Sequence, residues 1–199
     1  MTTILVRASI PADAQVVTGL VTDAFEGEGA VVAELVDALA AHPCGRDGLS
    51  FVAVADDVVV GHVMVTRSRL DTFPRTIDVG VLSPLTVDAE WRRRGIARQL
   101  VDTAVTAAQN AGLPLLFLEG DPAFYSRLGF DPAKPHGFRK PSIRIPDAAF
   151  QVKRLAGYEA WMTGTLVYAE PFWDLDCVGL RDPEILRWLA AEVAEGREL

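Results

Sequence analysis

The residues best suited to chemistry form a basic, glycine-containing loop near the middle of the chain. Arg92, Arg93 and Arg94 stand just before Gly95, where a predicted helix begins. The first amides of a helix have no intrahelical partners and lie at the positive end of its dipole, so they bind phosphate oxygens. Arginine adds planar donors, and glycine lets the backbone approach an anion closely. The loop predicts a phosphate site; the alternative is a solvated loop that binds nothing.

The elements around this loop support its placement at a helix start. The sequence contains no Gly-Lys-Ser/Thr of a P-loop and no three-glycine dinucleotide fingerprint closing a first strand. Residues 96–108 carry one apolar stripe at helical spacing, and Gly112 is a plausible end for that helix. The fully apolar run 115–118 predicts a strand buried on both faces. Strand, loop, helix and strand in this order predict two parallel strands with a right-handed crossover.

A second motif follows the buried strand. Residues 124–130 have the sequence Phe-Tyr-Ser-Arg-Leu-Gly-Phe, and Asp121 can cap a helix that starts at Pro122 and ends near Gly129. This segment resembles the Phe-Tyr-x-x-x-Gly-Phe signature of the GNAT superfamily of N-acyltransferases. The Arg-x-x-Gly-x-Ala pattern of residues 92–97 resembles the acyl-CoA loop of the same superfamily. Two independent motifs in the right order support the assignment.

The resemblance implies the fold and the domain organisation. It covers residues 4–132 well and 133–170 loosely. It implies an α/β fold of layered α+β type, in which helices lie on both faces of a mixed, mostly antiparallel sheet with splayed parallel strands four and five. We expect an acetyltransferase domain over residues 1–170. Residues 171–199 lie beyond the family core, and we expect them to form a C-terminal extension with a terminal amphipathic helix over 183–194. We expect this helix to pack on the same domain; the alternatives are that it extends the acceptor site or makes a dimer contact.

Periodicity and turn residues predict the other elements. Asp56-Asp57 predicts a hairpin turn, and the proline-rich basic region 131–147 predicts loop and edge strand. Pro84 marks either the bulge that GNAT folds carry in this strand or a plain strand boundary. Predicted strands cover residues 4–8, 49–55, 58–66, 76–87 and 164–170, and predicted amphipathic helices cover 13–25 and 30–41.

The implied reaction needs a base and a proton donor. An alkylamine with a pKa near ~10 must lose a proton before it attacks a thioester, and a departing thiolate gains from a proton donor. The family places a tyrosine at the sulfur, and Tyr125 occupies that position; the alternative is that it packs on the core and bonds a backbone carbonyl. Glu119 is the candidate base; the alternative is a contact with Arg127 or water. Asp88 and Glu90 are expected to shape the turn.

The resemblance also implies the cofactor contacts. By position, the main chain of Leu85, Thr86 and Val87 would pair with the pantetheine of acetyl-CoA, the acyl donor. The Val87 amide is the oxyanion donor that the sequence identifies. The pyrophosphate would bind the backbone amides of the loop and first helical turn, namely Arg93, Arg94, Gly95, Ile96, Ala97 and Arg98.

Composition limits the other possibilities. The net charge of −8 disfavours non-specific nucleic-acid binding, and no apolar stretch is long enough to span a membrane. The amino terminus lacks a secretory signal, and the widely spaced Cys44 and Cys177 suggest a reducing compartment, so we expect a cytoplasmic protein. The sequence shows no metal-ligand cluster, and His62 lies in an apolar run typical of a buried sheet residue.

These observations predict an N-acetyltransferase that uses acetyl-CoA and a primary amine. The first two helices, their loop at 26–29 and segments after Phe130 would form the acceptor pocket. A small-molecule amine or amino-acid derivative is the first choice of acceptor, and a protein amino group is the second. A non-catalytic acyl-CoA binding or sensing domain on the same scaffold is the rival from another class. A homodimer is possible.

Overall fold

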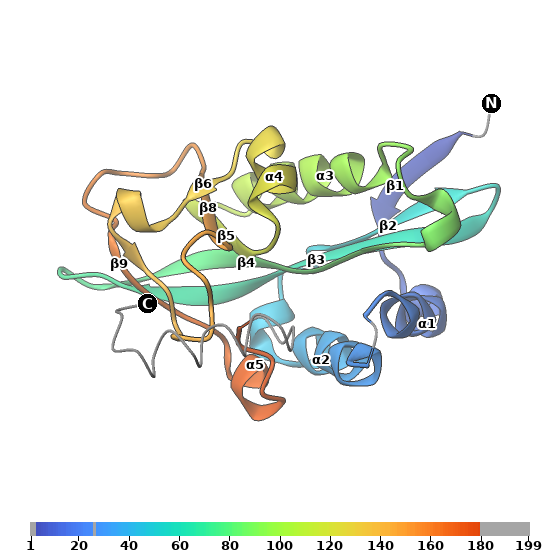
Figure 1. Ribbon diagram of the computed structural model, residues 1–199, viewed down its shortest axis with the longest axis horizontal. Helices are drawn as coiled ribbons and strands as arrows, with labels where there is room; N and C mark the ends of the chain where they lie inside the picture. The colour runs from blue at the N-terminus through green and yellow to red at the C-terminus, as the bar shows by residue number, and fades with distance from the viewer. Residues whose placement is uncertain (1–2, 26, 180–199) are drawn as a thin grey trace, which may run out of the picture.

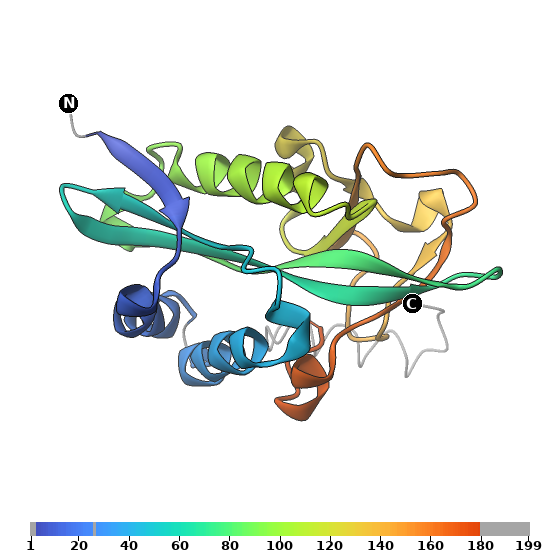
Figure 2. The same cartoon turned by 180° about the vertical axis from the view of Figure 1, so that it is seen from behind.

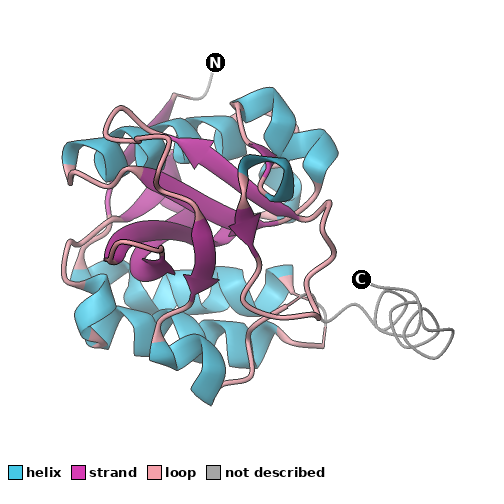
Figure 3. Ribbon diagram, turned by 90° about the vertical axis from the view of Figure 1, so that its left-hand side faces the viewer, coloured by secondary structure: helices cyan, strands magenta, loops and turns pink. Residues whose placement is uncertain are grey.

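A twisted β-sheet lies between two layers of helices (Figure 1). The computed structural model describes residues 3–25 and 27–179. Helices α3 and α4 cover one face of the sheet, and α1, α2 and α5 cover the other, as the edge-on view also shows (Figure 3). The bounds of these helices are α1 (Ala14–Ala24), α2 (Gly29–Ala41), α3 (Ile96–Asn110), α4 (Pro122–Tyr125) and α5 (Glu170–Asp174).

The described strands form one mixed sheet. Its main path runs β1-β2-β3-β4-β5-β8-β6, while β9 pairs with both β3 and β7. Pairing is antiparallel except between β4 and β5 and between β7 and β9, which confirms the predicted fold class. The strands are β1 (Ile4–Ala8), β2 (Ser50–Ala55), β3 (Val58–Asp71), β4 (Thr76–Val87), β5 (Leu115–Glu119), β6 (Asp131–Pro132), β7 (Phe138–Arg139), β8 (Phe150–Arg154) and β9 (Gly164–Val167).

The centre of the sheet opens between β4 and β5. The two strands pair only at Gly80–Leu116 and Val81–Phe117 before they separate. On the other side of β4, the register with β3 shifts so that two residues of β4, Ser83 and Pro84, lie opposite one residue of β3. This is a β-bulge, and it confirms the bulge interpretation of Pro84. The bulge and the divergence together leave an opening in the sheet between β4 and β5, which we call the seam.

Apolar side chains fill both faces of the sheet. Strand β5 is buried on both faces as predicted, because Phe117 packs in the cluster under α2 and α5 while Leu116 packs in the cluster under α3. The predicted stripe of α3 is buried from Ile96 to Ala108. The long β3–β4 hairpin runs along the molecule, as the reverse view shows (Figure 2), and contributes side chains to both clusters.

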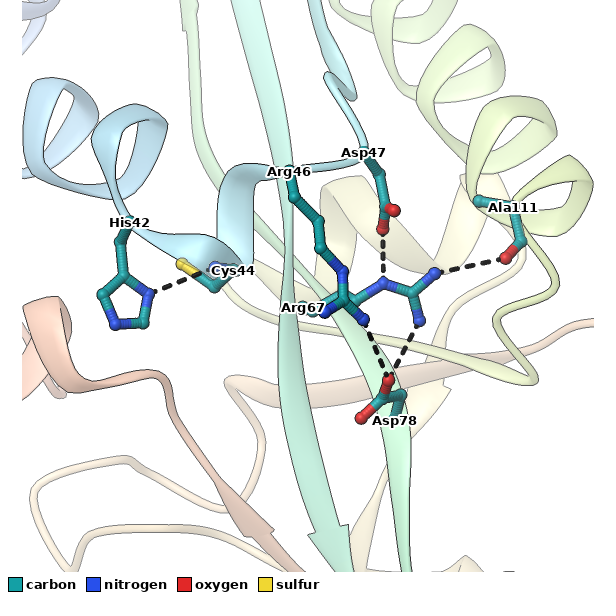
Figure 4. A network of polar contacts seen from close by, with 7 residues as sticks. All are labelled: His42, Cys44, Arg46, Asp47, Arg67, Asp78 and Ala111. Atoms are coloured by element: carbon teal, nitrogen blue, oxygen red, sulfur yellow. Dashed lines mark hydrogen bonds and ion pairs between the residues drawn. The ribbon is translucent and has the colours of Figure 1, made fainter.

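An arginine ties the hairpin to its surroundings (Figure 4). Arg67 of β3 donates to the carboxylates of Asp47, in the loop before β2, and Asp78 of β4. It also donates to the carbonyl oxygen of Ala111, at the end of α3, over 3.4 Å. Arg46 lies 3.7 Å from the same Asp78 carboxylate. All three nitrogens of the Arg67 guanidinium donate a hydrogen bond. Arg67 thus connects β3, β4, the loop before β2 and the end of α3.

The structure adds one strand to the sequence-based prediction and corrects the ends of two others. Strand β8 was not predicted, although it pairs along the whole of β5. Strand β3 runs to Asp71 and not to residue 66, because its far half pairs with β4 and β9. The predicted strand 164–170 ends at Val167, because Pro171 occupies the first turn of α5.

The other predicted elements agree within one or two residues, and positive φ at Asp56 and Asp57 confirms the hairpin turn. Phe172 and Val178 pack in the core beneath β5, while the predicted helix 183–194 lies outside the described residues. No helix in the described part of the chain is long and apolar enough to cross a membrane.

Candidate active site

The basic loop turns sharply into α3. Gly95 precedes the helix with φ 80°, and Arg93 also has a positive φ of 63°. A Cβ at Gly95 would meet no protein atom, so the space above it is open. Within residues 3–25 and 27–179, no side chain caps this helix. Its first amides are therefore available to a ligand, as an anion site requires.

A cavity of about 400 Å³ lies at this loop, and we call it the loop cavity. The Arg92 guanidinium donates to the Val87 carbonyl over 3.2 Å, and Arg98 donates to the Arg127 carbonyl over 3.3 Å. These two bonds hold cationic side chains beside the helix start. The predicted residues that line the cavity are Val87, Arg93, Gly95, Ile96, Ala97 and Arg98.

A second cavity, of about 470 Å³, lies at the opening between β4 and β5, and we call it the seam cavity. Leu85 and the bulge residues of β4 form one wall. Tyr125 of α4 and Glu119 at the end of β5 line the same cavity. The structure therefore brings both predicted catalytic side chains to one place, beside the bulged strand.

Tyr125 is held by aromatic packing, and its hydroxyl has no hydrogen-bond partner among the residues described. Its ring lies 4.9 Å from that of Phe124 and 5.7 Å from that of Phe130. A Cβ at Gly120 would come within 2.4 Å of the ring, so glycine is needed there for the tyrosine to fit. Burial raises the pKa of Tyr125 to about 12. The hydroxyl is thus protonated near neutral pH, and it does not make the carbonyl contact of the alternative interpretation.

Glu119 is a largely buried carboxyl with an unusual pKa. Burial raises its pKa to about 7, against the opposing effects of the Tyr168 hydroxyl, the Gly179 amide and the Arg144 charge. The Tyr168 hydroxyl donates to Oε1 of Glu119 over 2.6 Å. Arg127, the partner considered from sequence, lines the loop cavity instead. A carboxyl that titrates near neutrality can exchange protons at working pH, as a general base must.

The remaining predicted residues lie as follows. Thr86 is only 3% exposed and lies opposite His62 in the β3–β4 register, so its side chain lines neither cavity. Arg94 lies 4.6 Å over the ring of Trp91, beside the loop cavity but outside its lining. Asp88 accepts from the Glu90 amide over 2.9 Å, as expected of a turn-shaping residue.

His62 is a buried sheet residue, as predicted, but it is not fully satisfied, because its Nδ1 has no hydrogen-bond partner among the described residues. Its Nε2 lies 2.9 Å from the Ser50 hydroxyl, and burial lowers the pKa of His62 to about 4. The ring is therefore neutral near pH 7. Over the described residues, no group of His, Cys, Asp and Glu side chains could hold a metal ion.

Sequence reasoning missed Tyr168, the partner of Glu119. The two residues are 49 positions apart, and Tyr168 directly follows β9 at the end of an ordinary strand pattern. No motif marks it. The contact exists because β9 pairs with β3 and brings the chain back beneath the end of β5.

Comparisons of sequence agree with this geometry. The model of the acetyltransferase (GNAT) domain matches residues 46–132. The chain is 34% identical over 175 residues to the uncharacterized N-acetyltransferase YhbS of Escherichia coli, a match that covers 84% of this chain and 98% of that protein.

Solved structures give the same result. The crystal structure of YhbS from Escherichia coli in complex with CoA matches with a TM-score of 0.74 and 33% identity, over 86% of this chain and 93% of that one. A GNAT family acetyltransferase from Brucella melitensis, in complex with acetyl-CoA, matches with a TM-score of 0.67. Its identity is 23%, with 85% of this chain and 98% of that chain covered, so this likeness concerns the fold.

Proposed function

The chain belongs to the GNAT family of N-acetyltransferases, and we propose that it transfers an acetyl group from acetyl-CoA to the primary amine of a small molecule. One observation carries the proposal. Tyr125, a proton donor, and Glu119, a carboxyl with a pKa of about 7, line one cavity at the seam between β4 and β5.

The loop cavity has the groups that the acyl donor needs. The open space above Gly95, the uncapped start of α3 and three neighbouring arginines suit a pyrophosphate. The main chain of Leu85, Thr86 and Val87 continues from there toward the seam cavity and would pair with pantetheine. We assign the amides of Arg93 to Arg98 to the phosphates on this basis.

The two side chains divide the proton transfers. As a carboxylate, Glu119 takes one proton from the acceptor ammonium, directly or through water, and the nitrogen attacks the acetyl carbon. The carbon–nitrogen bond forms, the carbon–sulfur bond breaks, and the sulfur leaves with the electron pair. Tyr125 donates its phenolic hydrogen to the sulfur, and the second nitrogen proton replenishes the phenol through water. Glu119 then returns its proton to solvent.

The lining of the seam cavity favours a small acceptor with an apolar body. Phe25, Val32 and Leu35 come from the region of α1 and α2, and Phe172 comes from α5. Its described lining contains the carboxyls Glu28 and Glu119 but no lysine, arginine or histidine. An ammonium near carboxyls with its apolar part against these side chains fits this composition.

Thermal melts and thiol release test the proposal. We expect acetyl-CoA and CoA to raise the melting temperature, because a ligand at a hundred times its Kd stabilises a fold by ~2.7 kcal/mol, whereas ATP and NAD should not. Thiol release is then measured with two small amines, phenethylamine and phenylalanine amide, and with a lysine-containing peptide.

The outcomes separate the alternatives. Release with a small amine, lost in Glu119→Gln, supports the proposal. Release only with the peptide favours a protein amino group. Stabilisation by acetyl-CoA without release from any amine favours the binding or sensing domain.

A further inference from the structure

The side chain that hydrogen-bonds to the candidate base belongs to a residue that directly follows a distant strand, β9. Tyr168 is 5% exposed, and its hydroxyl donates to the Glu119 carboxyl over 2.6 Å. At that distance the bond is a strong, charge-assisted one when Glu119 is ionised. A buried phenol needs such an acceptor, and a buried carboxylate needs such a donor.

Tyr168 is itself fixed on several sides. The amide of Ala169 donates to the Ser68 hydroxyl over 3.2 Å, and the indole of Trp173 donates to the Tyr168 carbonyl over 3.3 Å. The Tyr168 ring also lies 4.8 Å from the ring of Phe172. Strand β3, the start of α5 and the core thus hold the phenol in one place, and the phenol in turn holds one oxygen of Glu119.

We propose that Tyr168 is a positioning residue that orients the Glu119 carboxylate for proton abstraction and stabilises its ionised form. The inference rests on the proposed function, since it assigns Glu119 as the base. A glutamate side chain has several rotatable bonds, so a base that must accept a proton from one direction benefits from a fixed partner.

Among the described residues, Tyr168 is the side-chain hydrogen-bond donor to Glu119. Arg144 acts on Glu119 through its charge, and the Gly179 amide bonds to it. Arg144 makes its own ion pair with Asp176 over 2.7 Å. The other titratable groups lining the cavity with Glu119 and Tyr168 are Glu28, before α2, Tyr125, of α4, and Cys177, after α5.

Replacing Tyr168 with phenylalanine removes the hydroxyl and keeps the ring. A hydrogen bond to an ionised group corresponds to roughly one to two pKa units, so the pKa of Glu119 should rise by about one unit or more. The ascending limb of the kcat–pH profile should move up by the same amount, while the KM for acetyl-CoA stays unchanged. Tyr158→Phe is the matched control, because Tyr158 lies outside the lining of the seam cavity and should shift neither quantity.

Carbon-13 NMR of labelled glutamate gives a readout that does not depend on an acceptor. The Glu119 signal is assigned by its absence in Glu119→Gln and titrated in each variant. An unshifted pKa in Tyr168→Phe overturns the inference. A shifted pKa in the NMR titration, with full activity in Glu119→Gln, overturns Glu119 as the base instead.

A second variant keeps the test valid if Tyr168→Phe does not fold. Site-specific 3-fluorotyrosine at position 168 keeps the ring and the hydroxyl but makes the phenol a stronger donor. The pKa of Glu119 and the pH limb should then move down, opposite to the phenylalanine variant. A shift in the same direction, or none, contradicts a direct role of the hydroxyl.

Discussion

The loop cavity and the seam cavity are built in different ways. The loop cavity uses backbone amides, a glycine with positive φ and exposed arginines, most of them within residues 91–98. The seam cavity uses buried and half-buried side chains from segments between Phe25 and Gly179, with ionisable groups whose pKa values burial has raised. The loop cavity therefore has fixed positive charges of the kind that suit an anion, whereas the seam cavity has a phenol and a carboxyl of the kind that suit proton transfer.

The difference suggests that the loop cavity determines the affinity for acetyl-CoA and that the seam cavity determines the rate of the chemical step. Binding at the loop depends on main-chain shape, so it should be sensitive to backbone changes and insensitive to the removal of single hydroxyls. Turnover at the seam cavity should instead be sensitive to the removal of a single hydroxyl and insensitive to backbone changes. Variants at each site can test this separation.

The largest effect is expected for Gly95→Glu. A side chain there must adopt a positive φ and enters the open space above the helix start, where its carboxylate opposes phosphate binding. We expect acetyl-CoA affinity to fall by ~10³-fold or more in isothermal titration calorimetry. Gly112→Glu is the matched control, because Gly112 has φ 76° and open space at the other end of α3. Equal affinity in Gly95→Glu and the control would refute the placement of the phosphates.

A smaller effect, on turnover alone, is expected for Tyr125→Phe. The substitution removes the proton donor but keeps the ring packed against Phe124 and Phe130. We expect kcat to fall ~10²-fold with little change in the Kd for acetyl-CoA. Stopped-flow thiol release and a binding titration on the same preparation measure the two quantities. Full turnover would exclude Tyr125 from the reaction, and a parallel loss of binding would contradict the separation between the two cavities.

The smallest effect concerns stability. The pKa of Glu119 is raised from 4.5 to about 7 in the folded state, so stability is lost as pH rises through that window. Glu119→Gln carries no charge, so it should be more stable than the parent at pH 8 by about 2 kcal/mol, or about 5 °C in Tm. The advantage should shrink toward pH 4.5, where the parent carboxyl is also neutral. Melting curves of both proteins from pH 4.5 to 8 measure it, and a constant difference would contradict the raised pKa.

Sequence reasoning predicted the geometry where the residues concerned are close together in the chain. The arginines, Gly95 and the start of α3 are contiguous, so their pattern predicts the geometry of the loop. The short spacing between Glu119 and Tyr125 likewise follows from one strand end and the helix after it. Local chain direction alone brings these two side chains to the same cavity.

The parts that sequence reasoning missed depend on long-range pairing. Strand β8 has the sequence Phe-Gln-Val-Lys-Arg, too short and too charged at one end to stand out by periodicity, yet it pairs along β5. Tyr168 reaches Glu119 only because β9 returns to β3. By contrast, the sequence does contain a signal for the correct end of the last strand, which was predicted to run to residue 170 and ends at Val167. Pro171 is a usual signal for the first turn of a helix.

The divergence of β4 from β5 has a consequence for the behaviour of the protein in solution. Past Val81, the side of β4 that faces β5 has no strand partner in the described sheet, so it is a strand edge inside the fold. Outer edges invite pairing with other chains and promote aggregation, whereas this edge lies between two strands of the same molecule. Its amides should exchange hydrogen with solvent quickly in the free protein and slowly once a ligand pairs with them. The unpaired side of β4 can thus accept a ligand without lying at an outer edge of the sheet, where another protein chain could pair with it.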